Sequence, residues 1–267
     1  MSLRLGDEVV SSGVTERPLR VDCGHGEVPG ILWRPEAASG PTGLIAIGHG
    51  GTQHKRSPNV LGLARRFVRH LGVSVVSLDA PSHGERVVDA ELAARQRAGL
   101  ARRLSEPAPA GALEGRVSEQ ARHVLETLDQ AVAEWRAVLD ALESRGLARR
   151  PFGYWGLSMG AMIGLPLVAA EQRIAAAVLG LVGASVAGLP GAEARRAAAA
   201  QVRVPVLFVL QLDDQLVARD SGLALFDALG SADKVLHAFP GGHVDTPMSE
   251  RDAYDDFFAR NLAPSAH

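Results

Sequence analysis

Short apolar runs alternate with amphipathic stretches along most of this 267-residue chain. Apolar runs that are rich in β-branched residues and bounded by turn residues predict buried strands. These runs span residues 44–47, 73–78, 152–155, 174–181, 204–210 and 234–240. Because strands that alternate with helices form parallel sheets, the pattern predicts an α/β fold with a mostly parallel central sheet flanked by helices.

Helices are predicted between these strands by apolar residues that recur every three or four positions. They span residues 61–71, 90–104, 159–171, 193–202, 221–229 and 251–261, and an apolar stripe over residues 124–142 ends before Gly146. Residues 19–34 alternate in polarity and predict one or two leading antiparallel strands. Pro166 lies inside the helix at 159–171, where its missing backbone donor predicts a bend. No second core is needed, so we expect one domain over residues 1–267.

Residues 87–120 are too many for an ordinary connection and predict a helical insertion. Parallel sheets bind ligands outside the carboxyl ends of their strands, which is where this insertion begins. The insertion is therefore a candidate lid, and the alternative is a solvated surface excursion. A lid would turn Leu92, Leu100 and Leu104 towards a pocket and Arg95, Arg102 and Arg103 towards water.

Composition and charge narrow the class of partner. The net charge is −2, and no basic run is long enough to indicate nucleic acid. No apolar run reaches the roughly 18 residues of a membrane span. Cys23 is the single cysteine, which excludes an internal disulfide, and residues 1–30 contain no apolar signal-like region. We expect a cytoplasmic protein with no nucleic-acid or membrane partner, and the oligomeric state is left open.

A Gly-x-Ser-x-Gly motif, Gly156 to Gly160, lies between a predicted strand and a predicted helix. Glycines on both sides of the serine permit the tight turn of a nucleophile elbow. Ser158 is therefore the candidate nucleophile. A similar Gly-x-Ser follows another strand at Ser185, but the Gly188-Leu189-Pro190 sequence after it opposes a helix, so Ser185 is interpreted as structural.

A serine nucleophile needs a histidine base and a carboxylate that orients the histidine. His243 follows the last predicted strand after two glycines, and His237 lies within that strand and is expected to pack. Asp213 and Asp214 both follow the strand at 204–210. The order serine, aspartate, histidine is that of the α/β-hydrolases, and either aspartate satisfies it.

Glycines also follow the first predicted parallel strand, in the sequence Gly48-His49-Gly50-Gly51-Thr52. Backbone N–H groups can hold a developing oxyanion only where no side chain intervenes. The expected oxyanion-hole donors are the N–H groups of Gly51 and of Met159, the residue after the nucleophile. His49, Gly50 and Thr52 are candidate substrate contacts, and His49 is also expected to shape this loop.

Through these motifs, and through Asp79-Ala80-Pro81-Ser82-His83-Gly84, residues 28–263 resemble the α/β-hydrolase superfamily and its dienelactone-hydrolase-like and esterase-like members. The resemblance implies a serine hydrolase that cleaves carboxylic esters of small molecules through an acyl-enzyme. The superfamily acid commonly reads Asp-x-x-Val, which favours Asp214. Dienelactone hydrolases use a cysteine nucleophile, so Ser158 argues against that particular reaction.

Two alternatives remain at this stage. The same triad could cleave peptides or thioesters, because the triad residues do not determine which leaving group is cleaved. A non-catalytic binding protein could also share the fold, although such a protein would not need serine, acid, histidine and oxyanion glycines together. Asp22, Cys23 and His25 are too close in sequence to surround one ion, so neither a metal nor a cofactor is expected.

Overall fold

A ten-stranded mixed sheet forms the centre of the molecule in the computed structural model, which describes residues 2–105, 123, 125–185 and 191–262. Its strands are β1 (Leu3–Leu5), β2 (Val9–Ser11), β3 (Val14–Asp22), β4 (Glu27–Pro35), β5 (Thr42–Gly48), β6 (Ser74–Leu78), β7 (Ala148–Leu157), β8 (Ile174–Gly180), β9 (Val206–Gln211) and β10 (Lys234–Phe239). The strand order is β1-β3-β4-β6-β5-β7-β8-β9-β10, and β2 pairs with β3. The predicted α/β fold class is confirmed.

Strands β6, β5, β7, β8, β9 and β10 run parallel, whereas β4 joins β6 antiparallel and continues into the leading hairpins. In the parallel part, Ile47 pairs with Trp155 and Leu179 pairs with Phe208. The carboxyl ends of β5, β7 and β9 consequently lie at one edge of the sheet. The loops that carry the candidate site residues all leave from this edge.

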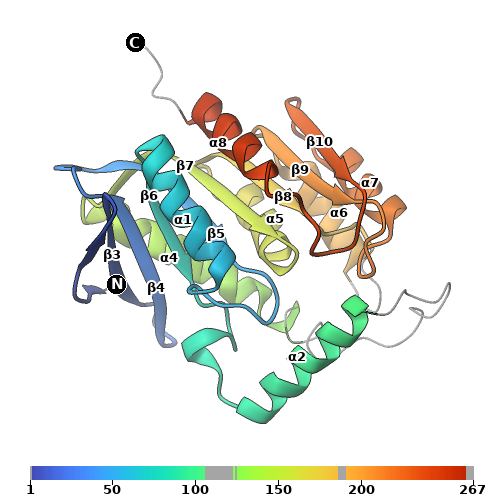
Figure 1. Ribbon diagram of the computed structural model, residues 1–267, viewed down its shortest axis with the longest axis horizontal. Helices are drawn as coiled ribbons and strands as arrows, with labels where there is room; N and C mark the ends of the chain where they lie inside the picture. Colours follow the sequence, from blue (N-terminus) through green and yellow to red (C-terminus); the bar gives the residue numbers. More distant parts are fainter. Residues whose placement is uncertain (1, 106–122, 124, 186–190, 263–267) are drawn as a thin grey trace.

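Helices cover both faces of the sheet (Figure 1). They are α1 (Pro58–Leu71), α2 (Ala90–Ser105), α4 (Leu128–Ser144), α5 (Met159–Ala170), α6 (Ala192–Gln201), α7 (Arg219–Ala228) and α8 (Glu250–Asn261), with a 3₁₀ turn η1 (Gly84–Arg86). One face packs against α1 and α8 in a core that includes Phe67, Trp155 and Phe258. The other face packs against α4 to α7 around Trp135, Tyr154 and Phe208. Burying both faces explains why the strands are apolar runs and do not alternate in polarity.

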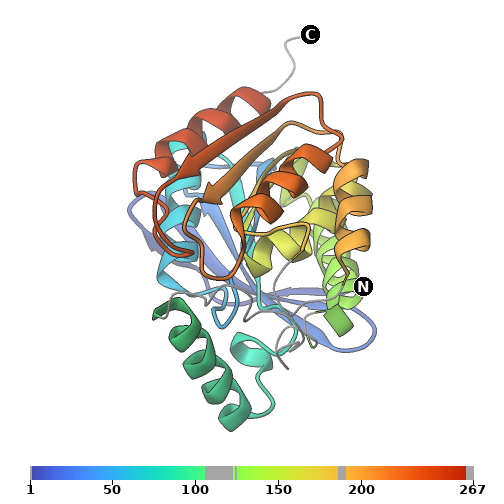
Figure 2. The same ribbon diagram turned by 90° about the vertical axis from the view of Figure 1, so that its right-hand side faces the viewer.

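Helix α2 extends away from the sheet (Figures 1 and 2). Its bounds agree with the predicted helix at 90–104, and no side chain in it is buried. The rest of the predicted insertion, residues 106–120, lies outside the described residues. Helix α5 runs through Pro166 without interruption, and the predicted bend there stays a prediction. None of the helices in the described ranges is long and apolar enough to cross a membrane.

Candidate active site

Ser158 lies in the sharp turn between β7 and α5, with φ 57° and ψ −121°. A non-glycine residue is rarely found in this conformation, and such strain is typical of functional positions. Neighbouring glycines make the turn possible. A Cβ on Gly156 would lie 2.7 Å from the Gly160 carbonyl carbon, and one on Gly160 would collide with the Gly48 carbonyl oxygen. The tight approach of β5, β7 and α5 thus explains the spacing of the motif.

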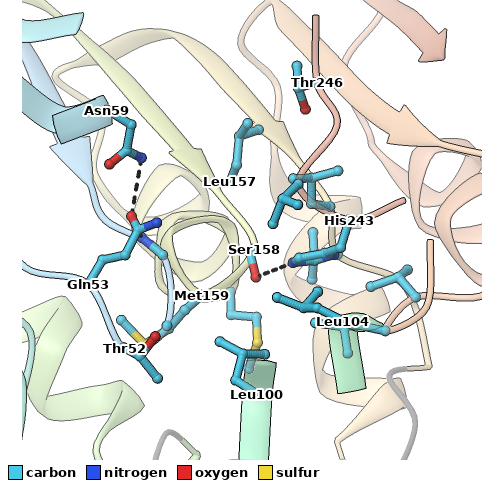
Figure 3. Close-up of a pocket in the computed structure, with 18 of the residues that line it drawn as sticks. Thr52, Gln53, Asn59, Leu100, Leu104, Leu157, Ser158, Met159, His243 and Thr246 are labelled. Atoms are coloured by element: carbon cyan, nitrogen blue, oxygen red, sulfur yellow. Dashed lines mark hydrogen bonds between the residues drawn. The ribbon is translucent and has the colours of Figure 1, made fainter. Parts of the chain in front are cut away.

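The Ser158 hydroxyl is hydrogen-bonded to His243, and His243 is hydrogen-bonded to Asp214 (Figure 3). The distance from Ser158 Oγ to His243 Nε2 is 2.8 Å, and the distance from His243 Nδ1 to Asp214 Oδ2 is 2.7 Å. His243 is 6 % exposed. The structure therefore brings together three side chains from the ends of β7, β9 and β10 in the geometry of a nucleophile, a base and an orienting acid.

Of the two candidate acids, the structure places Asp214 and not Asp213 beside the histidine. The Asp214 side chain is 1 % exposed, and its Oδ1 accepts the backbone N–H groups of Leu216 at 2.7 Å and Val217 at 3.0 Å. The Asp213 side chain is 67 % exposed. Its Oδ2 accepts the N–H of Gly241 at 3.2 Å, so Asp213 holds the loop that precedes His243.

Gln215 was missed by sequence reasoning, although it contacts the histidine loop directly. Its Oε1 accepts the backbone N–H of His243 at 3.0 Å, and its Nε2 donates to the Leu104 carbonyl oxygen in the last turn of α2 at 3.2 Å. One carboxamide therefore bridges the loop of His243 and the helical insertion. The local sequence around Gln215 does not predict this role, because both of its contacts depend on tertiary packing.

The glycine loop after β5 borders the same cavity as Ser158. The Gly50 N–H is taken up by Gln53 Oε1 at 3.3 Å, and Asn59 Nδ2 donates to the same oxygen at 3.1 Å. Gly51, Thr52 and Met159 also line the cavity. Because the Gly50 donor is occupied, Gly51 and Met159 stay the predicted oxyanion donors.

His49 does not line the cavity, and the substrate contact expected for it stays a prediction. It is 2 % exposed, its Nδ1 is bonded to the Gly50 carbonyl at 2.9 Å, and its Nε2 accepts the Ala80 N–H at 3.1 Å. Burial lowers the pKa of His49 to about 4, so the ring is neutral at pH 7. Both ring nitrogens are used by backbone groups, and the side chain shapes the loop, as the second expectation stated.

A buried ion pair connects this loop to the turn after β6. Lys55 Nζ lies 2.6 Å from Asp79 Oδ2 and 2.6 Å from Glu85 Oε1, and Asp79 Oδ1 accepts the Lys55 backbone N–H at 3.0 Å. Burial raises the pKa of Asp79, but hydrogen bonds from Lys55 and Glu85 outweigh it and hold that pKa below its usual value. The glycine loop is thus fixed at both ends by buried polar contacts.

The cavity around Ser158 has a volume of about 650 Å³ and a mostly apolar lining. Leu100, Arg103 and Leu104 of α2 form part of its wall. The expected inward positions of Leu100 and Leu104 agree with this, and Arg95 and Arg102 are exposed as expected. Leu92 does not line the cavity, although it was expected to face the pocket. Arg103 was expected to face water, but it lines the cavity, and burial lowers its pKa. A long arginine side chain can place its stem against apolar surface next to the two leucines.

The remaining candidates of the sequence lie outside this cavity. The Ser185 backbone N–H donates to Ser221 Oγ at 2.7 Å, and His237 Nδ1 is 2.8 Å from Glu250 Oε1. Burial raises the pKa of the Cys23 thiol to about 11, which keeps the thiol protonated. Across the described ranges, no group of three or more histidine, cysteine, aspartate or glutamate side chains could hold a metal ion.

Several solved structures are similar to this chain. A cold-adapted esterase from an Arctic intertidal metagenomic library is 34% identical, and the match covers 98% of this chain and 100% of that chain with a TM-score of 0.76. Acetyl xylan esterase 1 from a Thermoanaerobacterium species is 15% identical, with coverage of 97% of this chain and 87% of that chain and a TM-score of 0.69. A dienelactone hydrolase from Anabaena variabilis is 16% identical, with coverage of 94% and 100% and a TM-score of 0.62. No protein-family model and no curated protein matches the chain.

Proposed function

The chain belongs to the α/β-hydrolase superfamily as a carboxylic ester hydrolase, and from that premise we propose that Ser158, His243 and Asp214 are its catalytic triad. The observation that carries the proposal is the hydrogen-bonded series from Ser158 Oγ through His243 to the buried Asp214 carboxylate. A serine hydroxyl is a poor nucleophile unless a base takes its proton. In this proposal, His243 Nε2 takes that proton, and Asp214 holds the Nδ1–H tautomer.

In the first half of the reaction, Ser158 Oγ attacks the ester carbonyl carbon while its proton passes to His243 Nε2. The carbonyl oxygen becomes an oxyanion that accepts hydrogen bonds from the backbone N–H groups of Gly51 and Met159. The C–O bond to the alcohol then breaks, and His243 returns the proton to the departing oxygen. An acyl-enzyme on Ser158 and a free alcohol result.

In the second half, water attacks the acyl carbon and gives its proton to His243 Nε2. The same two N–H groups hold the second oxyanion. When this intermediate collapses, the proton returns to Ser158 Oγ and the carboxylic acid leaves. His243 therefore acts as base and acid once in each half-reaction, and Asp214 stabilises the imidazolium each time.

The substrate in this proposal is a small-molecule ester held largely by apolar contacts. Leu100 and Leu104 of α2 form one wall of the cavity, which supports the proposal that the predicted insertion, within a single domain, acts as a lid. An apolar wall on a separate helix would select among acyl or alcohol groups by their size.

The direct test replaces Ser158 with alanine and measures turnover of 4-nitrophenyl acetate. We expect Ser158→Ala to lower kcat by on the order of 10³-fold or more, because a triad works as a unit. Ser185→Ala is the matched control, since this serine also follows a sheet strand but lies outside the cavity. A Ser158→Ala enzyme with a tenth of normal turnover would remove Ser158 from the mechanism.

The same assay decides the leaving group. Thioester and anilide analogues of the acetate ester probe the thioesterase and peptidase alternatives, which the triad alone does not separate. We expect the oxygen ester to have the highest kcat/KM after correction for the intrinsic reactivity of each leaving group. Faster cleavage of the thioester or the anilide would assign the enzyme to that substrate class instead.

A further inference from the structure

The cavity extends to both sides of the nucleophile. In Figure 3, Asn59 and Thr246 lie on one side of the Ser158–His243 pair, and Leu100 and Leu104 lie on the other. We call the first part the α1–α8 chamber and define it by Asn59, Leu63, Trp155, Met248, Arg251 and Tyr254, all of which line the cavity. The proposed acyl transfer needs no polar group in this chamber, yet it contains several.

One buried hydroxyl of the chamber has no acceptor for its proton. Trp155 is 4 % exposed and Tyr254 is 2 % exposed, and the indole N–H of Trp155 interacts with the Tyr254 oxygen, whereas no described residue accepts the proton of the Tyr254 hydroxyl. Their rings meet edge to face, with centroids 5.9 Å apart. Buried donors are nearly always satisfied in folded proteins, so a buried hydroxyl without an acceptor beside the cavity indicates a missing acceptor.

Arg251 contributes a positive charge to the same chamber. Arg251 lies three residues before Tyr254 on α8. Its guanidinium approaches α1, as shown by the distance of 3.8 Å between Arg251 Nη1 and the position that a Cβ on Gly62 would take. Arg251 forms no ion pair with any described residue, and its helix neighbours Glu250, Asp252 and Asp255 form theirs with other residues. Glu250 pairs with His237, and Asp252 and Asp255 pair with Arg66.

The carboxylate of Glu250 acts on Tyr254 but pairs with His237 and does not line the cavity. Among the described residues that line the cavity, none is aspartate or glutamate. The first turn of α1, which contributes Pro58 and Asn59 to the lining, contains no acidic residue, and its N-cap Ser57 makes no side-chain capping bond. A helix N-terminus carries a partial positive charge, so α1 adds to the field of Arg251.

The position of Arg251 is not explained by helix stability. A cation in the first turn of a helix opposes the macrodipole, and acidic residues are preferred there. Burial raises the pKa of Tyr254, so its hydroxyl stays a neutral donor at neutral pH. The chamber therefore offers donors and a positive charge, and it lacks the anion that would match them.

We propose that the α1–α8 chamber binds a carboxylate on the ester substrate, so that the enzyme prefers esters with a negative charge away from the scissile bond. Arg251 pairs with the carboxylate, and the Tyr254 hydroxyl, held by Trp155, provides a neutral donor beside it. The inference rests on the proposed function only for the location of the scissile bond at Ser158. It makes Arg251 a specificity-determining residue that takes no part in acyl transfer.

The experiment compares charged and neutral esters of matched size. In the first pair, mono(4-nitrophenyl) adipate carries a carboxylate on its acyl part, and 4-nitrophenyl hexanoate is its neutral counterpart. In the second pair, 4-acetoxybenzoate carries a carboxylate on its alcohol part, and 4-acetoxybenzamide is its neutral counterpart. We expect the wild-type enzyme to have a higher kcat/KM for the anionic member of at least one pair. Arg251→Met should lower kcat/KM for that ester by about 10- to 100-fold, the usual range for a charge-assisted hydrogen bond, and should affect the neutral member far less.

Three further variants identify the source of the effect. Arg251→Lys keeps the charge and should retain part of the preference, and Tyr254→Phe should reduce it by a few-fold, on the order of one neutral hydrogen bond. Arg260→Met removes one positive charge at the exposed far end of the same helix and should leave the preference unchanged. Competitive inhibition by adipate, measured with the neutral ester, should weaken in Arg251→Met and not in Arg260→Met.

The outcomes are distinguishable. Equal loss on both members of each pair in a folded Arg251→Met enzyme would overturn the inference, and so would a wild-type preference for the neutral esters. Loss of the preference in Arg103→Met but not in Arg251→Met would move the carboxylate to the α2 side and would also overturn it. Failure to hydrolyse any ester would contradict the proposed function alone. The chamber would still be tested by a thermal shift assay, in which adipate should raise the melting temperature of the wild type and not that of Arg251→Met.

Discussion

The two adjacent aspartates after β9 show how much a single position decides. Asp214 is buried against His243 and accepts two backbone N–H groups, whereas Asp213 is mostly exposed and braces Gly241. We expect Asp214→Asn to lower kcat by on the order of 10³- to 10⁴-fold, since an amide stabilises the wrong imidazole tautomer. Asp213→Asn should lower kcat by less than about tenfold, because its contact is exposed. Steady-state kinetics of both variants check the ranking, and the reverse order would transfer the role to Asp213.

A second residue-scale prediction concerns the pH dependence of stability. The pKa of His49 falls from 6.5 to about 4 on folding, so the unfolded chain binds more protons between these values. The free energy of unfolding should therefore fall as pH drops from about 6.5 to 4, with up to about 3 kcal/mol due to His49. The ring centroids of His83 and His49 lie 5.2 Å apart, and burial also lowers the pKa of His83. His83 therefore also lowers the free energy of unfolding as the pH falls.

Urea unfolding of the wild type and of His49→Asn at pH 7 and pH 4.5 isolates the His49 contribution. Asparagine keeps a donor and an acceptor but does not titrate. The variant should lose less stability between the two pH values than the wild type. The same loss in both proteins would show that other groups dominate acid sensitivity.

At the scale of elements, Gln215 connects the helical insertion to the histidine loop. Gln215→Glu keeps an acceptor for the His243 N–H but places an oxygen against the Leu104 carbonyl, and Gln215→Met removes both contacts. We expect Gln215→Met to lower kcat by about tenfold, because His243 loses a positioning bond. Gln215→Glu should change mainly KM and the preference for acyl-chain length. Identical kinetic profiles for the two variants would show that the two contacts of Gln215 do not act separately.

The glycine loop and the turn after β6 are held together by Lys55 and Asp79. Asp79 is fully buried, so Lys55→Met would leave its carboxylate without a counter-charge. We expect the free energy of unfolding to fall by about 3–5 kcal/mol. Arg69→Met, which removes an exposed cation from α1, is the control and should change it by less than about 0.5 kcal/mol. Denaturant unfolding at pH 7 measures both, and equal small effects would mean that the pair contributes little.

Across the whole molecule, the sequence predicted what depends on local patterns. The apolar runs predicted the parallel strands, and the ends of β5, β7 and β9 placed Gly51, Ser158 and Asp214 at one edge because parallel strands share their direction. The catalytic roles of these residues stay predictions.

Other features have no local signal. β1 and β2 are three residues each, too short for a pattern to register. The second contact of Gln215 and the approach of Arg251 to α1 arise from packing between elements that are distant in sequence. The hydrogen bond of His49 to the Ala80 N–H could not be predicted, because a motif gives the order of residues and not the direction of a side chain.

The central claim is that Ser158 becomes acylated during ester hydrolysis, and mass spectrometry tests it most directly. The wild-type enzyme is mixed with 4-nitrophenyl acetate, quenched in acid within its first turnovers and digested. A rapid burst of 4-nitrophenol should accompany a single acetyl group on the peptide that contains Ser158, and Ser158→Ala should show neither. Acetyl groups on any other residue at burst stoichiometry, or hydrolysis by Ser158→Ala at the wild-type rate, would contradict the account.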